Sequence, residues 1–167
     1  QASSSAASDV YKRQDKISIN SAAIRRPELI TAISNQFGKQ CVVVAVDIKK
    51  IDDNWFVFSN GGRQATGIKA IEWCQQIASL GAGEILLTSM NNDGTKEGFA
   101  LDITDQIAQL VSIPVIASGG AGSIDDFRAL FTKTKASAGL AASIFHYQEI
   151  SLQALKNELK TFQIPIR

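Results

Sequence analysis

The sequence predicts an α/β fold built around a parallel sheet, and two features of its pattern carry that prediction. Short apolar runs rich in β-branched residues alternate with segments whose apolar residues recur at helical spacing. Glycine, proline or serine stands at most of the junctions between them. Five strand–helix units follow one another in 167 residues, a length that suits one domain.

The strands are assigned from apolar runs that polar residues bound on both sides. The run CVVVAVD at 41–47 is continuous, which is typical of a strand buried on both faces. The segment 54–63 predicts a hairpin near Gly61 and Gly62 that interrupts the second unit. In chain order, the predicted strands are 16–20, 41–47, 84–89, 114–118 and 138–143.

The helices are assigned from apolar residues on one face and from recognisable ends. Pro27 suits the first turn of the first helix, and Gly38 suits its C-terminal cap. Gly81 ends the second helix, and Ser123 begins the fourth. In chain order, the predicted helices are 27–37, 67–81, 101–111, 123–131 and 151–162.

Composition and charge exclude several classes of function. The formal net charge of +1 gives no reason to expect nucleic acid or a membrane surface as a partner. Cys41 and Cys74 lie in apolar surroundings without metal-binding spacing, which favours free thiols in the cytoplasm. The single histidine, His146, leaves no multi-histidine metal cluster, so we expect no metal. Residues 1–14 are small, polar and aperiodic, and we interpret them as an unrelated or disordered tail before a fold at 15–167.

Polar residues gather just after the predicted strands, and their position helps to choose the architecture. An open doubly wound sheet and part of a (β/α)₈ barrel both fit the pattern. An open sheet would concentrate glycines after its first strand, whereas a barrel brings every strand end to one face, where active sites lie. Five units are too few to close eight strands, so we expect an incomplete TIM barrel. The clusters are Asn20, Asp47, 91–95, 118–122 and Ser143.

Two of these clusters suggest chemistry. A carboxylate at the barrel mouth suits proton transfer, although Asp47 is equally suited to capping a turn. The glycine turn 118–123 leads into a helix start, where backbone N–H groups and the helix dipole favour phosphate, although a tight turn needs the same glycines. The stretch 141–143 follows the next strand, and adjacent late loops of barrels often share one phosphate. We therefore expect a phosphate site across both loops.

Five stretches then follow one another in order: DKISINSAA, VVVAVDIKK, GAGEILLTSMNNDGTKEGF, PVIASGGAG and LAASIFHY. Together they resemble the cyclase subunit (HisF type) of imidazole glycerol phosphate synthase, from histidine biosynthesis. The resemblance runs from Asp15 to about the end of the chain and implies βα units 4 to 8 of a (β/α)₈ barrel. It implies a lyase that converts a ribulosyl-aminoimidazole carboxamide nucleotide (PRFAR) and ammonia to imidazole glycerol phosphate and AICAR. It also implies that a glutaminase subunit supplies the ammonia and that no cofactor is required.

The resemblance also assigns roles to residues. Asp47 matches the second catalytic aspartate, the general acid of ring closure, and the first catalytic aspartate has no counterpart, so we expect little or no activity from the isolated chain. Thr88 and Ser89 line the mouth, and Asp93 is a loop carboxylate at the substrate. One phosphate site comprises Gly94, Ser118, Gly119, Gly120, Ala142 and Ser143. The other comprises Asn20 and Ser21, while Lys16 and Glu84 match the ammonia gate and Asp15 signals to the glutaminase.

Three departures and two alternatives accompany this interpretation. Asn91 replaces a usually acidic residue, Arg63 is in a position to replace a phosphate-facing lysine, and 133–139 departs from the usual lead into the last strand. The first alternative is the paralogous phosphoribosyl-aminoimidazole carboxamide isomerase, which also uses two carboxylates. The second is a non-catalytic phosphate-binding half-barrel, whose exposed strand edges and apolar interior would favour dimers or aggregates.

Overall fold

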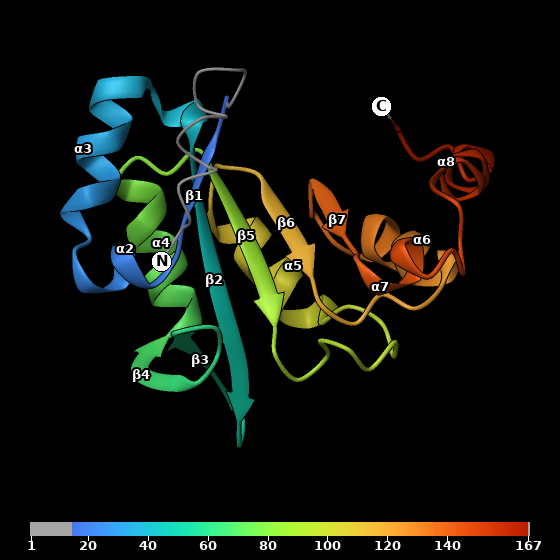
Figure 1. Ribbon diagram of the computed structural model, residues 1–167, viewed down its shortest axis with the longest axis horizontal. Helices are drawn as coiled ribbons and strands as arrows, with labels where there is room; N and C mark the ends of the chain where they lie inside the picture. Colours follow the sequence, from blue (N-terminus) through green and yellow to red (C-terminus); the bar gives the residue numbers. More distant parts are fainter. Residues whose placement is uncertain (1–14, 167) are drawn as a thin grey trace.

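A computed structural model describes residues 15–166, in which helices pack against one mostly parallel seven-stranded sheet (Figure 1). The prediction made for residues 1–14 lies outside the described residues. The strands are β1 Ile17–Ile19, β2 Val42–Ile51, β3 Asn54–Ser59, β4 Gln64–Lys69, β5 Glu84–Ser89, β6 Val115–Ser118 and β7 Ala138–Leu140. The α-helices are α2 Ser21–Arg25, α3 Glu28–Phe37, α4 Ala70–Ser79, α5 Leu101–Leu110, α6 Ile124–Lys133, α7 Ser143–His146 and α8 Leu152–Thr161, and η1 Lys39–Cys41 is a short 3₁₀ turn.

The strand order β4-β3-β2-β5-β6-β7 makes β2 the centre of the sheet, with β1 also paired to β2. β1, β5, β6 and β7 run parallel to it, as expected for strands joined by helical crossovers. The first residues of β2 pair with β1, and its last residues pair with the antiparallel strand β3. The parallel α/β sheet predicted from the sequence is therefore confirmed.

Several predicted boundaries were wrong, and the hairpin explains two of them. β2 continues to Ile51 instead of ending at Asp47, because β3 pairs with residues 47–51. The predicted helix 67–81 begins only at Ala70, because Lys69 still pairs with Phe56 in the hairpin. The last predicted strand ends early, because α7 begins directly after Ala142.

One face of β2 is buried from Val42 to Ile48, and the other face carries the polar chemistry. Val44, Val46 and Ile48 are fully buried against the helices, whereas Ala45 and Asp47, which alternate with them, are half-buried. The prediction that this strand is buried on both faces was wrong at Ala45 and Asp47, because the helices α3 to α5 cover only one face, although Val43 on the other face is buried. The half-buried face is therefore the one on which Asp47 is accessible to a ligand.

Two apolar clusters form the core. The large core cluster packs β2 and β5 against α3, α4 and α5, and the small core cluster packs β6 against α6, α7 and α8 (Figure 1). The large core cluster contains Ala23, Ile30, Val42, Val44, Val46, Ile48, Val57, Ala70, Trp73, Cys74, Ile77, Ala82, Ile85, Leu87, Ile103, Ile107 and Val115. The small core cluster contains Phe99, Ala117, Ala121, Phe127, Leu130, Ile144, Leu155 and Leu159.

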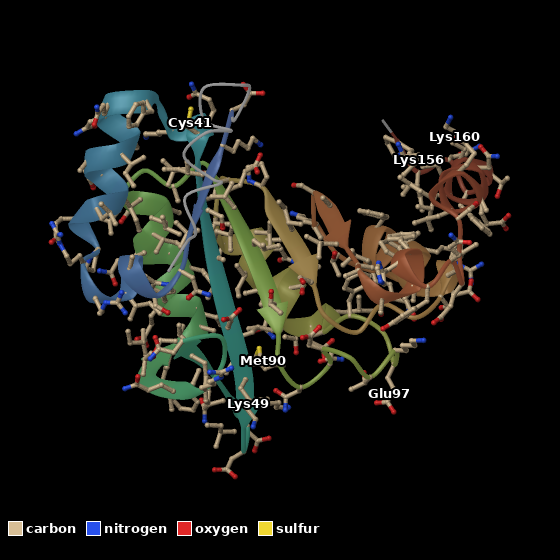
Figure 2. The ribbon with its side chains drawn as sticks, in the orientation of Figure 1. Cys41, Lys49, Met90, Glu97, Lys156 and Lys160 are labelled. Atoms are coloured by element: carbon tan, nitrogen blue, oxygen red, sulfur yellow. The ribbon has the colours of Figure 1, made fainter. Side chains whose placement is uncertain are left out.

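The parallel strands give the molecule two distinct ends. Figure 2 shows Lys49, Met90 and Glu97 at the end where the parallel strands finish, and Cys41 at the end where they begin. Among residues 15–166, no helix is both long enough and apolar enough to cross a bilayer.

Candidate active site

A pocket of about 190 Å³ lies where β5, β6 and β7 finish. The loop after β5, the glycine turn after β6 and the residues at the end of β7 form its walls. The residues that line it are Asp93, Gly94, Lys96, Ser118, Gly119, Gly120, Ala121, Leu140, Ala141, Ala142 and Ser143. All six residues expected at one phosphate site are in this lining, together with Asp93, so three separate loops converge as the sequence predicts.

The pocket wall depends on close contact between two backbones. Gly98 N–H donates to the carbonyl of Gly120 over 2.8 Å, which joins the loop after β5 to the glycine turn. A Cβ on Gly120 would lie 2.1 Å from the Gly98 carbonyl oxygen, and one on Gly119 would lie 2.7 Å from the Ser89 carbonyl oxygen. Both glycines also have positive φ, near +98° and +91°, which other residues rarely adopt. Glycine is therefore required here by the approach of the neighbouring loop.

Two asparagines hold the loop after β5 in place. Asn92 accepts from the Ser89 hydroxyl over 2.7 Å and donates to the Gly98 carbonyl over 2.9 Å. Asn91 Oδ1 accepts from the backbone N–H of Lys50 over 2.8 Å, which joins the loop to the extension of β2. This bond gives Asn91 a structural role that an acidic residue at position 91 could also fill, because a carboxylate oxygen accepts as an amide oxygen does.

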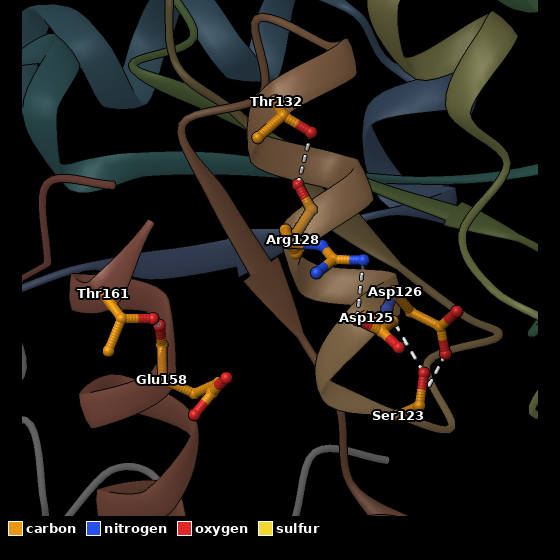
Figure 3. A network of polar contacts seen from close by, with 7 residues as sticks. All are labelled: Ser123, Asp125, Asp126, Arg128, Thr132, Glu158 and Thr161. Atoms are coloured by element: carbon orange, nitrogen blue, oxygen red, sulfur yellow. Dashed lines mark hydrogen bonds and ion pairs between the residues drawn. The ribbon is translucent and has the colours of Figure 1, made fainter. Parts of the chain in front are cut away.

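The start of α6 is capped by the side chains of Ser123 and Asp126. The Asp126 carboxylate accepts from the N–H groups of Gly122 and Ser123 over 2.9 and 2.8 Å, and Asp126 N–H donates to the Ser123 hydroxyl over 3.2 Å (Figure 3). This is a capping box, so those two N–H groups are not available to a phosphate. The glycine turn lines the pocket only as far as Ala121, so the expected phosphate-site residues Ser118, Gly119 and Gly120 lie before the capped segment.

Asp47 lies on the half-buried face of β2 and accepts a hydrogen bond from Asn20 Nδ2 over 3.0 Å. The other side-chain atom of that amide, Asn20 Oδ1, is buried and has no hydrogen-bond partner among residues 15–166. Ser21, expected at the same phosphate site as Asn20, accepts from the backbone N–H of Asn60 over 2.8 Å. The structure thus brings Asp47, Asn20 and the turn of the hairpin together, away from the lining of the pocket.

A row of polar residues connects Asp47 with the pocket. Asp47 on β2 is in register with Thr88 on β5, and Thr88 is in register with Ser118 on β6. Neighbouring strands lie about 4.8 Å apart, so the row places Asp47 about 10 Å from Ser118 at the pocket wall. Ser89 points to the opposite face and is buried there, where its hydroxyl donates a hydrogen bond to Asn92. Of the pair expected at the mouth, Thr88 therefore shares the face of Asp47 and Ser89 does not.

The residues expected at an ammonia gate lie at the opposite end of the strands. Lys16 and Glu84 form an ion pair there, at the start of β1 and of β5. Asp15 is exposed and directly precedes Lys16. The structure therefore separates these three residues from the pocket by the length of the strands.

The family model described as histidine biosynthesis protein matches residues 3–151. This chain belongs to that family. It is 53% identical over 154 residues to the imidazole glycerol phosphate synthase subunit HisF of Alkaliphilus metalliredigens, and 55% identical over 155 residues to that of Clostridium botulinum strain Kyoto. Each alignment covers 92% of this chain, which spans 61% of the length of these relatives.

Two residues of the pocket lining, Lys96 and Leu140, were missed by the sequence analysis. Lys96 lines the pocket, and its ammonium pairs with Glu149 over 2.6 Å. The available signal was a lysine two positions after the Asp-Gly pair of a loop already expected at the substrate. The capping role of Asp126 was also readable, from an acidic residue three positions after Ser123.

Proposed function

We propose that this chain supplies the phosphate-holding wall and one catalytic acid of a HisF-type cyclase. In this proposal the pocket holds one phosphate of PRFAR, and Asp47 serves the ring-forming part of the substrate. The observation that carries the proposal is the row of Asp47, Thr88 and Ser118, which runs from a half-buried carboxylate to a pocket walled by glycines. The identity of 53% and 55% to HisF subunits supports the same conclusion.

The contacts of Asp47 fit the role of general acid. Asn20 donates to Oδ2, which leaves Oδ1 as the oxygen that can carry and deliver a proton. Addition of ammonia to the ketone of PRFAR and release of AICAR each require proton transfer. We assign delivery at ring closure to Asp47, with Thr88 beside it on the same face and Asp93 at the pocket. Asn20 and Ser21 serve the second phosphate, close to the hairpin turn.

The opposite end of the strands fits an ammonia entrance. In this proposal the five parallel strands belong to a (β/α)₈ barrel, and a glutaminase subunit docks where they begin. Lys16 and Glu84 pair at that end and gate the ammonia, and the exposed Asp15 lies against the docked subunit. The reaction occurs in the cytoplasm and uses no cofactor.

Calorimetric titration of the full chain with PRFAR tests the proposal. We expect PRFAR to bind, inorganic phosphate to compete with it, and the dephosphorylated analogue to bind at least tenfold more weakly. Asp47→Asn is the matched control, because it removes the acid and leaves the pocket lining unchanged, so its affinity should stay within about twofold. Equal affinity for PRFAR and its dephosphorylated analogue would contradict the proposal.

A turnover assay tests the assignment of the catalytic groups. The family reaction uses two carboxylates, and the described residues supply Asp47 for one of them. With PRFAR and ammonium ions, we therefore expect binding with little or no formation of AICAR by the isolated chain. Sustained AICAR formation that Asp47→Asn does not reduce would show that the acid lies elsewhere.

A further inference from the structure

A single cation lines the candidate phosphate pocket. Among the described lining residues, Lys96 is the only one with a positive charge and Asp93 the only one with a negative charge. The remaining lining is backbone and small or apolar side chains. A phosphate group in this pocket would lie near the Asp93 carboxylate, and like charges at short range repel. A nearby cation would offset this repulsion, and Lys96 is the lining residue in place to supply it.

The backbone of Lys96 is held in a conformation that does not suit a lysine. Its φ is +60°, in the left-handed region that glycine adopts most easily. A Cβ on Gly122 would lie 2.5 Å from the Lys96 carbonyl oxygen, so the glycine turn accommodates this backbone closely. The Thr95 hydroxyl donates to the Asn92 carbonyl over 2.7 Å and accepts from Glu97 N–H over 3.2 Å. Strained positions of this kind gather at functional sites.

Lys96 pairs with Glu149, whose backbone is held by hydrogen bonds but whose carboxylate is partly exposed. Glu149 follows α7, where its N–H and that of Ile150 both donate to the Ile144 carbonyl, over 2.9 and 3.2 Å. The side chains of Lys96 and Glu149 are 43% and 39% exposed, so water screens their attraction and the pair contributes little stability. An ammonium held this weakly is free to exchange one anion for another. A phosphate dianion offers a stronger charge-assisted hydrogen bond than a single exposed carboxylate.

We infer that Lys96 is the cation that recognises phosphate in this pocket, and that Glu149 competes with phosphate for its ammonium. This inference rests on the proposed phosphate function of the pocket. Without ligand, the Lys96–Glu149 pair joins the loop after β5 to the segment after α7 at the pocket rim. With phosphate bound, the ammonium turns from Glu149 to the phosphate oxygens. Glu149 is then a positioning residue that sets the affinity through Lys96.

Titration with inorganic phosphate, by calorimetry on the full chain, tests this inference. Lys96→Gln should lower the phosphate affinity at least tenfold, since it removes a charge-assisted hydrogen bond. Lys160→Gln is the matched control, because it removes the same charge from α8, away from the pocket (Figure 2), and should change the affinity less than twofold. Lys96→Gly should lose the same affinity while keeping or raising the melting temperature, because glycine relieves the positive φ. Measuring both the affinity and the melting temperature of Lys96→Gly separates loss of binding from loss of folding.

The role of Glu149 is tested by a double-mutant cycle. Glu149→Gln should raise the phosphate affinity about threefold in the unchanged chain and leave it unaltered in Lys96→Gln. An equal rise in both backgrounds would overturn the competition, because Glu149 would then act by direct repulsion. If the unchanged chain binds phosphate and Lys96→Gln binds it as well as Lys160→Gln does, the inference fails and the proposed function stands. Absence of phosphate binding by the unchanged chain would overturn both.

Discussion

The two ends of the polar row are built in different ways. At the Ser118 end, the backbones of three loops enclose a pocket above the small core cluster. At the Asp47 end, two side-chain contacts, from Asn20 to Asp47 and from Asn60 to Ser21, lie beside the large core cluster. The pocket wall is thus built from backbone beside the smaller core, and the surroundings of Asp47 are built from side chains beside the larger one.

This difference predicts different responses to substitution. A wall made of backbone depends on glycines at close contacts, so adding one methyl group is enough to open it. A carboxylate held by one amide tolerates change in packing but depends on the identity of its partner. The Asp47 end also has an unused hydrogen-bond acceptor, because Asn20 Oδ1 is buried and has no partner among the described residues.

The largest effect is expected at the backbone wall. Gly120→Ala places a Cβ 2.1 Å from the Gly98 carbonyl oxygen at φ +98°, so we expect a loss of about 2 to 4 kcal/mol in unfolding free energy. We also expect a loss of more than tenfold in phosphate affinity. Gly61→Ala is the control, because Gly61 has φ +66° with nothing within 4 Å of the added Cβ. It should cost about 1 kcal/mol and leave phosphate binding unchanged.

Urea unfolding and phosphate titration of both variants check this prediction. Equal destabilisation by the two substitutions would show that the contact between Gly120 and Gly98 relaxes without cost. The backbone wall would then be no more rigid than the hairpin turn, and the two ends of the polar row would not differ in their response to substitution.

The large core cluster is tested by its buried thiol. Burial raises the pKa of Cys74 from 9.0 to about 12. Between these values the unfolded chain loses the thiol proton and the folded chain keeps it, so stability is complete below about pH 9 and falls as pH rises towards 12. At pH 10 we expect a loss of about 1 kcal/mol relative to pH 8.

Urea unfolding of variants at pH 8 and pH 10 isolates this contribution. Cys74→Ala should abolish about 1 kcal/mol of the loss between the two pH values, whereas Cys41→Ala, at the half-buried cysteine, should retain it. An unchanged pH dependence in Cys74→Ala would mean that burial does not hold the Cys74 thiol in its protonated form in the folded chain.

Local patterns in the sequence were sufficient for most of the fold. Residues 84–89 form a strand with the predicted bounds, because the apolar run begins at Glu84 and ends at the polar loop after Ser89. Ser123 begins α6, because its hydroxyl accepts from an N–H that otherwise lacks a partner. The boundaries that failed, at Asp47 and at Ala70, depend on pairing between segments, which no local pattern reports.

The candidate site divides in the same way. Most of the residues that line the pocket were expected to lie together, because they belong to segments that follow strands and parallel strands bring their ends together. Lys96 was not named, because its place at the pocket depends on a positive φ in the loop. The role of Asn91 was also unpredictable, since its partner Lys50 lies 41 residues away on an extension of β2 that the sequence analysis did not foresee.

The smallest effect is expected at the bond that ties the two ends together. Asn91→Ala removes the acceptor for the exposed Lys50 N–H, so we expect a loss of about 0.5 to 1 kcal/mol in stability and faster hydrogen exchange at the Lys50 amide. Asn91→Asp keeps an acceptor oxygen and should retain that protection. Phosphate affinity should stay within about twofold in both variants, because Asn92 and Gly98 still hold the pocket wall. A tenfold loss in Asn91→Ala would show that the extension of β2 helps to shape the pocket, so that the two ends act as one site.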